Sequence, residues 1–306
     1  MTRHIPNAAA RRAYLRAAAF MLSAALLFSP AAGEIVPCAT LRDAYFLGRA
    51  AEDARAGEVR FSLPAAVLNQ PHRIHEDKVT PGEWDEHDAV WNMIYLFPSV
   101  YMMSYAVYPR DGEMRVDLYF YYRDGVRLLD ASREGGPLSA PESAALEKAK
   151  AIAAGADPSL PPRERLLQLC GALCDAITFL DPRNAPEGWD VKSCITALTR
   201  GRANCQGYSD AFFLAASLAG FEVRYQNGWN RSGESHTWNR ALIDGAWLDV
   251  DLTWMDSGGG NPEKYFLTDP SDPVPGHIPE ESVWPLSPDQ AGCAVKRDPL
   301  MVSGSR

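Results

Sequence analysis

An Asp244-Gly245 pair separates two runs of apolar and aromatic residues, 235–243 and 246–252. This dipeptide adopts the positive φ angles that a two-residue turn between antiparallel strands requires, and it is the strongest short-range signal for a β-hairpin. A two-residue turn also sets the register of the strands, because the numbers of paired residues then have a constant sum. The residues that flank the turn are predicted to face each other, and pairing continues outward from them.

This register puts a histidine and an aspartate on the same face of the hairpin. His236 is predicted to face Thr253. Trp238 is predicted to face Asp251, which makes Asp251 a diagonal neighbour of His236. Diagonal neighbours lie roughly 7 Å apart at the Cβ level, within reach of an imidazole–carboxylate hydrogen bond. Asp249 is the rival carboxylate on that face, but it lies further from His236.

Cys205 precedes an apolar segment, residues 206–218, which is predicted to be a helix that stops at Gly220. A thiol at a helix N-terminus meets the positive end of the helix dipole, which favours the thiolate, and N–H groups there can bind an oxyanion. Cys205, His236 and Asp251 therefore form a candidate triad. The thiol attacks, the imidazole moves the proton to the leaving amine, and the carboxylate holds the imidazole tautomer.

The rest of the chain predicts an α+β protein with a small N-terminal α+β domain, residues 39–135, and a larger domain over 140–270 that carries the candidate triad. A linker with a glycine pair covers residues 133–137, and a C-terminal extension covers 271–306. Helices are expected at 39–56, 84–95, 140–154 and from 162 onward; strands are expected at 59–63, 101–108, 114–122 and 223–228.

Residues 1–33 are predicted to be a signal peptide. Three arginines, at positions 11, 12 and 16, precede an apolar run over 17–28, and small residues follow it. The run is shorter than the roughly 20 apolar residues of a membrane span. The paired arginines also allow a twin-arginine export signal. Cys38 does not follow a good lipobox. We therefore expect an exported protein, periplasmic or extracellular, without a stable membrane anchor after signal cleavage.

The net charge of −9 argues against a nucleic-acid partner, which would require a basic patch. No zinc-ligand spacing is present, and no cofactor is predicted. Export allows the six cysteines to form disulfides. A bridge from Cys170 or Cys174 to Cys194 and buried free thiols remain equal alternatives. The pairing of five cysteines stays open: Cys38, Cys170, Cys174, Cys194 and Cys293.

Three linked motifs resemble the transglutaminase-like superfamily over roughly residues 140–270. They are Cys-x-Gly-Tyr at 205–208, His-x-Trp-Asn at 236–239 and Trp-x-x-Val-Asp-x-Thr-Trp at 247–254. The order of cysteine, histidine and aspartate agrees as well. Tyr265-Phe266-Leu267 and His277 are similar to the continuation of bacterial members.

The resemblance implies a papain-like core, in which the helix that bears the cysteine packs on an antiparallel sheet. Cys205 would be the nucleophile, His236 the base and Asp251 its orienter. The implied activity is that of a cysteine protease or amidase, or of a protein-glutamine transglutaminase, on a protein or peptide of the cell envelope. Asn204 departs from the small apolar residue often found before the cysteine, which affects the expected shape of the pocket.

Other residues carry weaker predictions. Four aromatic residues are candidates to bind substrate, with core packing as the alternative: Trp189, Tyr208, Trp229 and Trp238. Residues 256–261 are predicted to be a flexible exit from the hairpin rather than a calcium loop. His72, His75 and His87 are scattered and indicate no metal site.

Two further functions are open at this stage. A disulfide at Cys205 would make the chain a catalytically silent binding or structural module of the envelope. Alternatively, the N-terminal segment, residues 39–135, could be the functional part as a partner-binding domain.

Overall fold

The computed structural model describes residues 34–39, 41–65, 97–230, 232–257, 262–270 and 277–279. The chain forms two compact units, residues 1–68 with 104–120 and residues 69–103 with 121–306. Several predictions lie outside the described residues: the signal peptide over 1–33, the helix at 84–95, the scattered histidines His72, His75 and His87, and Cys293. In the described part of the chain, no helix has both the length and the apolar character needed to cross a membrane.

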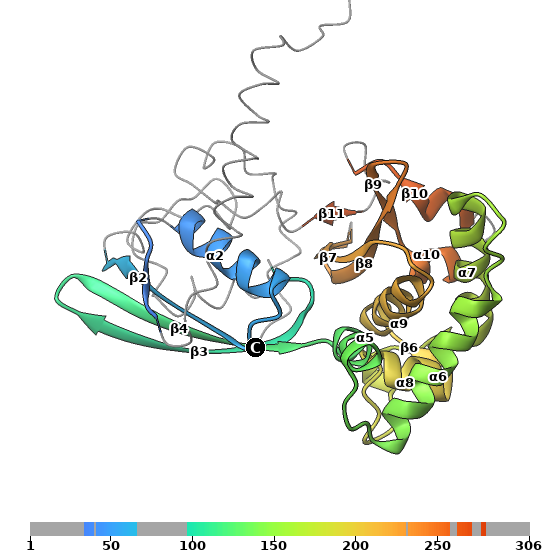
Figure 1. Cartoon of the computed structure of the whole chain (residues 1–306), viewed down its shortest axis with the longest axis horizontal. Coiled ribbons are helices and arrows are strands. Elements are labelled where there is room, and N and C mark those ends of the chain that lie inside the picture. Colours follow the sequence, from blue (N-terminus) through green and yellow to red (C-terminus); the bar gives the residue numbers. More distant parts are fainter. Residues whose placement is uncertain are drawn as a thin grey trace, which may run out of the picture. The chain divides into compact units, whose positions relative to one another are not determined.

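In its described residues, the first unit is a small sheet with the strand order β1-β2-β4-β3 and the helix α2 (Figure 1). β2 (Glu58–Pro64) pairs in parallel with β1 (Val36–Pro37) and antiparallel with β4 (Glu113–Tyr122). Alternate residues of β2 are buried, as a half-covered sheet requires. Helix α2 (Leu41–Asp53) contacts β2, and β3 (Val100–Arg110) borders β4. The predicted N-terminal helix and hairpin are confirmed.

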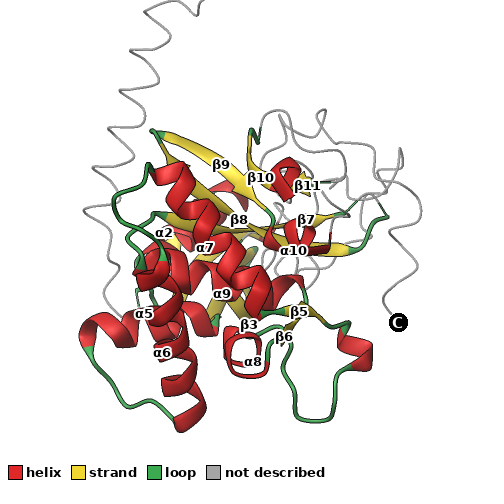
Figure 2. Ribbon diagram, turned by 90° about the vertical axis from the view of Figure 1, so that its right-hand side faces the viewer, coloured by secondary structure: helices red, strands yellow, loops and turns green. Residues whose placement is uncertain are grey.

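The second unit is built around helix α9 (Cys205–Leu218), which lies among other helices and against a sheet (Figure 2). Most of α9 is buried because its residues are apolar or small on nearly every side. The helices packed on it are α5 (Asp124–Glu134), α6 (Ala140–Gly155), α7 (Pro162–Ala176), α8 (Cys194–Arg200) and α10 (Leu252–Ser257). The sequence pattern predicted α6, α7 and α9, but not the short helices α5, α8 and α10.

The sheet of this unit has the strand order β10-β9-β8-β7-β11. Its strands are β7 (Val223–Trp229), β8 (Ser235–Ile243), β9 (Ala246–Val250), β10 (Phe266–Thr268) and β11 (Ile278–Pro279). A parallel pair, β5 (Thr178–Phe179) and β6 (Arg202–Ala203), and two 3-10 turns, η2 (Pro182–Asn184) and η3 (Pro262–Tyr265), complete the elements. The predicted α+β architecture, with the cysteine-bearing helix packed on an antiparallel sheet, is confirmed.

The β8–β9 hairpin has the predicted turn and register. Asp244 and Gly245 both have positive φ angles, 52° and 80°, as in a two-residue type I′ turn. Ile243 pairs with Ala246, and the ladder continues to Asn239 opposite Val250.

The end of the predicted second strand is wrong, because β9 stops at Val250 rather than at residue 252. The chain turns into α10 instead. Asp251 caps this helix, since its Oδ1 accepts a hydrogen bond from the Trp254 amide at 3.1 Å. Thr253 and Trp254 therefore lie in a helix. The ladder ends at Asn239 opposite Val250, so the predicted pairings of His236 with Thr253 and of Trp238 with Asp251 do not form.

A buried carboxylate ties α9 to the starts of two other helices. Oδ1 of Asp210 accepts hydrogen bonds from the Gly125 amide in α5, at 3.0 Å, and from the Tyr225 hydroxyl, at 2.7 Å. Its Oδ2 accepts from the Cys194 amide, the first residue of α8, at 2.8 Å. Helix N-termini carry partial positive charge, which suits an anion. Asp210 thus fixes the position of α9, the helix that begins with Cys205, relative to α5 and α8.

Replacing Asp210 with alanine is expected to destabilise the protein by about 3 kcal/mol or more, because three buried donors lose their acceptor. Urea unfolding followed by circular dichroism measures the change in the free energy of unfolding. Asp175, an exposed carboxylate on α7, provides the matched control, and Asp175→Ala should change stability little. Equal stability losses in the two variants would contradict the role given to Asp210.

Candidate active site

Cys205 is the first residue of α9, and Asn204 caps the helix. The Asn204 side chain accepts hydrogen bonds from the amides of Gln206 and Gly207, at 3.1 and 3.2 Å. These are two of the amides that a helix leaves without intrahelical acceptors. Among the described residues the Cys205 amide has no acceptor, so this N–H remains available to a ligand. Asn204, unusual for the motif, thus has a clear structural role.

The loop before Cys205 is held from both sides. The Asn204 amide donates to the Val191 carbonyl at 2.9 Å, and the β5–β6 pair ends just before it. Gly207 lies so close to this loop that a Cβ there would be 2.4 Å from the Val191 oxygen and 2.9 Å from the Ala203 Cβ. The glycine of the Cys-x-Gly-Tyr motif is therefore required by this close approach.

His236 and Asp251 meet in the interior beside Cys205. The His236 Nε2 lies 2.7 Å from the Asp251 Oδ2, and both side chains are buried. The Cys205 thiol lies near enough to His236 to contribute to the raised pKa of the imidazole. Since Nε2 faces Asp251, the other ring nitrogen is left for the thiol. The structure thus brings together the three residues of the predicted triad.

Burial and charge act in opposite directions on this pair. Burial disfavours the imidazolium of His236, but the Asp251 carboxylate and the Cys205 thiol outweigh it and raise the pKa of His236 to about 10. Burial likewise disfavours the carboxylate of Asp251, yet the charge and hydrogen bond of His236 and the hydrogen bond of His277 lower its pKa to about 2. The charged forms are therefore favoured at neutral pH.

Asp249, the rival carboxylate, has a different partner. It is fully buried and accepts a hydrogen bond from the Arg240 Nε at 2.8 Å across the β8–β9 ladder. Asp251 is the hydrogen-bond partner of His236.

His277 joins the site, although no sequence signal assigned it a role there. Its Nε2 lies 2.8 Å from the same Asp251 Oδ2 that meets His236, and its ring stacks on Trp238 and Trp254, with centroids 4.3 and 4.4 Å away. It lies 26 residues after Asp251 in the chain. No local pattern links residues at such a separation, so only the fold could reveal this contact.

Ligand atoms of His236, Asp251 and His277 all lie within 4.8 Å of one another, which makes them the residues that could hold a metal. A tetrahedral metal with bonds of about 2.0–2.1 Å would separate its ligand atoms by about 3.3 Å. The distances of 2.7 and 2.8 Å found here are hydrogen-bond distances. The geometry is that of a hydrogen-bonded network, and metal binding would require the side chains to separate.

Burial keeps the other described thiols in the neutral form. Burial raises the pKa of Cys38 to about 11 and that of Cys174 to about 12, and it raises the pKa of Cys170 and Cys194 strongly. These groups stay protonated at neutral pH. All five described cysteines are free thiols, so neither of the bridges considered to Cys194 forms.

Two of the four predicted substrate-binding aromatics belong to the interior. Tyr208 is fully buried, and its hydroxyl proton lies within hydrogen-bond distance of two acceptors, the Ile177 carbonyl and the Asp256 carboxylate, so the structure places this side chain in the interior and not in a cleft. Trp238 is also fully buried and packs under the two histidines. Trp189, which stacks on Arg200, and Trp229 are partly exposed and remain candidates. Residues 258–261 of the proposed flexible exit lie outside the described residues.

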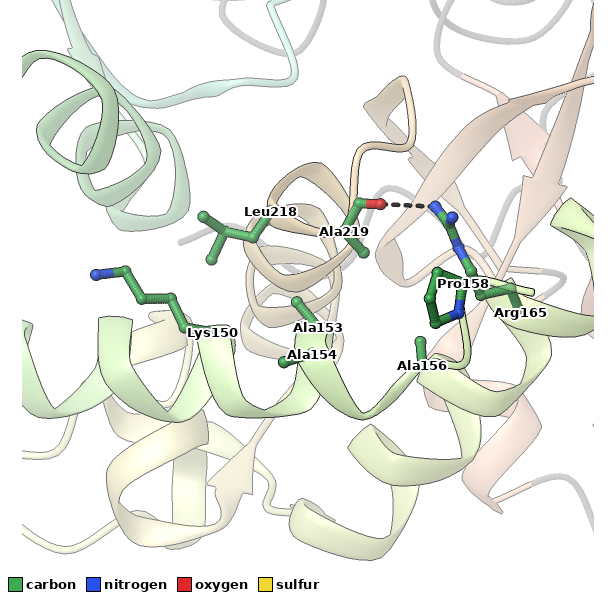
Figure 3. A pocket seen from close by; sticks show the side chains of 8 residues that line it. All are labelled: Lys150, Ala153, Ala154, Ala156, Pro158, Arg165, Leu218 and Ala219. Carbon is green, nitrogen blue, oxygen red and sulfur yellow. Dashed lines mark hydrogen bonds between the residues drawn. The ribbon is translucent and has the colours of Figure 1, made fainter. Parts of the chain in front are cut away.

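Two hollows of the second unit do not contain the triad. One of about 340 Å³ lies between α6, α7 and the end of α9 and is lined mainly by alanines, with Lys150 and Arg165 at its sides (Figure 3). Arg165 already donates to the Ala219 carbonyl at 2.6 Å. The other, of about 520 Å³, is lined by residues of α5, α6, α8 and the loop before α8.

Known proteins are similar to part of this chain. Residues 146–252 match the model of the transglutaminase-like superfamily. Human kyphoscoliosis peptidase is 32% identical over 108 residues, which cover 28% of this chain and 16% of that protein; the mouse protein is 31% identical over 105 residues, with the same coverage. The chain thus spans about one sixth of the length of these relatives.

Solved structures also align with the chain. A TGase matches with a TM-score of 0.34 and 13% identity, covering 66% of this chain and 52% of that one. The periplasmic domain of TgpA from Pseudomonas aeruginosa, bound to ethylmercury, matches with a TM-score of 0.29 and 18% identity over 46% and 55% of the two chains. The match to the transglutaminase-like superfamily thus covers residues 146–252, a segment that contains Cys205, His236 and Asp251.

Proposed function

We propose that this protein catalyses thiol-dependent acyl transfer at amide bonds, with Cys205 as nucleophile, His236 as proton carrier and Asp251 as its orienter. The observation that carries the proposal is the buried His236–Asp251 pair, 2.7 Å apart, with the Cys205 thiol near enough to raise the pKa of His236. A raised pKa of His236 favours a thiolate–imidazolium pair in the resting enzyme, so the nucleophile is formed before substrate binds.

The steps follow from these positions. The Cys205 sulfur bonds to the carbonyl carbon of a carboxamide or peptide, and negative charge moves to the carbonyl oxygen. The Cys205 amide, at the helix N-terminus, can donate to that oxygen. His236 gives its proton to the leaving nitrogen as the C–N bond breaks, which leaves a thioester on Cys205. Water or a second amine then attacks the thioester, gives its proton back to His236, and releases the product.

The final acceptor distinguishes two classes of enzyme. Water makes the protein a protease or amidase, and an amine makes it a crosslinking transglutaminase. We favour hydrolysis because it needs no site for a second substrate. The name peptidase, carried by the human and mouse relatives, agrees with this choice. The substrate is proposed to be a protein or peptide of the cell envelope, since residues 1–33 have the pattern of an export signal. N-terminal sequencing of secreted protein, expected to begin after residue 33, tests export.

Paired assays test the function. One follows ammonia release from glutamine peptides with and without an added amine, and the other follows cleavage of envelope peptides by mass spectrometry. Hydrolysis predicts peptide cleavage, or ammonia release that does not depend on the amine. Crosslinking predicts incorporation of the amine. Activity that persists unchanged after complete alkylation of Cys205 would refute the mechanism.

Alkylation itself gives a prediction that needs no substrate. At neutral pH, limiting iodoacetamide is expected to modify Cys205 before Cys38, Cys170, Cys174 and Cys194, because burial raises the pKa of those four thiols. Peptide mapping by mass spectrometry at successive times measures the order. Faster modification of Cys174, which is also partly exposed, would contradict the thiolate–imidazolium pair.

A further inference from the structure

The strongest feature outside the triad is the second histidine on its carboxylate. His277 directly precedes β11, which pairs with β7 through Ile278 opposite Trp229. This pairing is close, because a Cβ on Gly228 would lie 2.2 Å from the Ile278 carbonyl oxygen. Gly228 in turn pairs with His236 on the other side of β7. The pairing of β11 with β7 thus places His277 beside the triad, and the close approach of the two strands requires the glycine at position 228.

The contact with Asp251 identifies the donor atom of His277. A carboxylate only accepts, so the contact of 2.8 Å between Nε2 and the Asp251 Oδ2 puts a proton on Nε2. The Nδ1 is buried and has no hydrogen-bond partner within the described ranges. His277 is therefore held at the site through the hydrogen bond that its Nε2 donates to Asp251.

We infer that His277 is a positioning residue that holds the Asp251 carboxylate in place for His236; this inference rests on the proposed function. Asp251 receives three hydrogen bonds: from His236 and His277 on Oδ2, and from the Trp254 amide on Oδ1. When His236 gives its proton to the leaving group, its attraction for Asp251 weakens. His277 and the Trp254 amide then keep the carboxylate oriented until His236 is protonated again.

The surroundings of His277 suit this role. Its side chain is 1% exposed, and its ring lies between Trp238 and Trp254, nearly parallel to both, at interplanar angles of 7° and 9°. Two indole faces leave the ring little freedom to rotate, so the Nε2–H is directed at Asp251. The same packing excludes water that would otherwise compete for the carboxylate.

A matched pair of variants separates the hydrogen bond from the packing. His277→Gln retains an N–H donor near the position of Nε2 but loses the ring. His277→Phe retains the stacked ring but loses the donor. The readout is the rate of Cys205 alkylation by iodoacetamide as a function of pH, with thermal unfolding as the measure of fold. His277→Phe is expected to alkylate about tenfold more slowly at neutral pH, whereas His277→Gln stays close to wild type.

The result that overturns the inference is a folded His277→Phe with the wild-type rate and pH profile, or equal losses of rate in the two variants. If His277→Phe does not fold, ¹⁵N–¹H spectra of histidine-labelled wild-type protein give the answer. They are expected to show a proton on the Nε2 of His277, and a His277 whose only ring proton is on Nδ1 would overturn the inference. A wild-type Cys205 that does not alkylate selectively would instead refute the proposed function.

Discussion

Replacing Cys205 with alanine is expected to lower amide cleavage or acyl transfer by about 10⁴-fold or more, because no other group can form the thioester. Cys205 is the first residue of α9. Asn204 caps the helix, and the buried residues that follow Cys205 pack it, so the variant should fold. Initial rates of peptide cleavage and ammonia release, with thermal unfolding as a control, measure the effect.

Cys174→Ala is the matched control. Cys174 is the other described cysteine that is partly exposed, but its pKa is raised to about 12 and it lies on α7. This variant should retain the wild-type rate. The proposed mechanism would be refuted if Cys205→Ala kept its activity while Cys174→Ala lost it, or if both variants were fully active.

Replacing Asp251 with asparagine is expected to lower the rate by about 10⁴-fold while leaving Cys205 and His236 in place. An amide cannot supply the charge that stabilises the imidazolium. Burial, which lowers the pKa of His236, is then unopposed by Asp251. His236 should therefore lose its proton at a lower pH than in the wild-type protein, where its pKa is about 10. The alkaline limb of the alkylation profile should move to lower pH.

Stability should respond to pH through the same pair. The pKa of Asp251 is lowered from 3.8 to about 2, so its contribution to the free energy of unfolding is present above pH 3.8 and is lost as the pH falls through about 2. His236 has its pKa raised from 6.5 to about 10, so its contribution is present below pH 6.5 and is lost as the pH rises through about 10. Asp251→Asn should flatten both dependences, which urea unfolding at several pH values can measure.

Asp249→Asn is the control for Asp251→Asn. Both carboxylates are buried and only two residues apart, but Asp249 contacts Arg240 and not His236. Its replacement should cost stability and leave the pH profile of Cys205 alkylation unchanged. A shifted pH profile in Asp249→Asn, together with a normal profile in Asp251→Asn, would show that Asp249 and not Asp251 orients His236.

The sequence predicted the candidate triad because its geometry depends mainly on local rules. The Asp244-Gly245 turn sets the register of β8 and β9, and that register brings His236 near Asp251. The predicted strand was nevertheless too long. Asp251 is a good helix cap as well as a strand residue, and its hydrogen bond to the Trp254 amide starts α10. The competition between cap and strand was decided by this local hydrogen bond.

The aromatic residues show that the sequence pattern could not distinguish a substrate-binding side chain from a core side chain. Tyr208 and Trp238 were candidates for a substrate cleft, yet both are fully buried. A large apolar ring with one polar atom suits an interior and a cleft equally well, so composition and spacing do not separate the two. Only the packing of α9 against the sheet shows that these rings face inward.

The sequence by itself determined the hairpin register, the position of Cys205 at a helix start, and the resemblance to the transglutaminase-like superfamily. All three depend on turn chemistry, apolar periodicity and short motifs, which act between residues close in the chain. The tertiary structure alone decided that Asp210 joins three helices and that His277 shares Asp251 with His236. Those contacts join residues up to 85 positions apart, and their hydrogen bonds form only after the sheet and helices have packed.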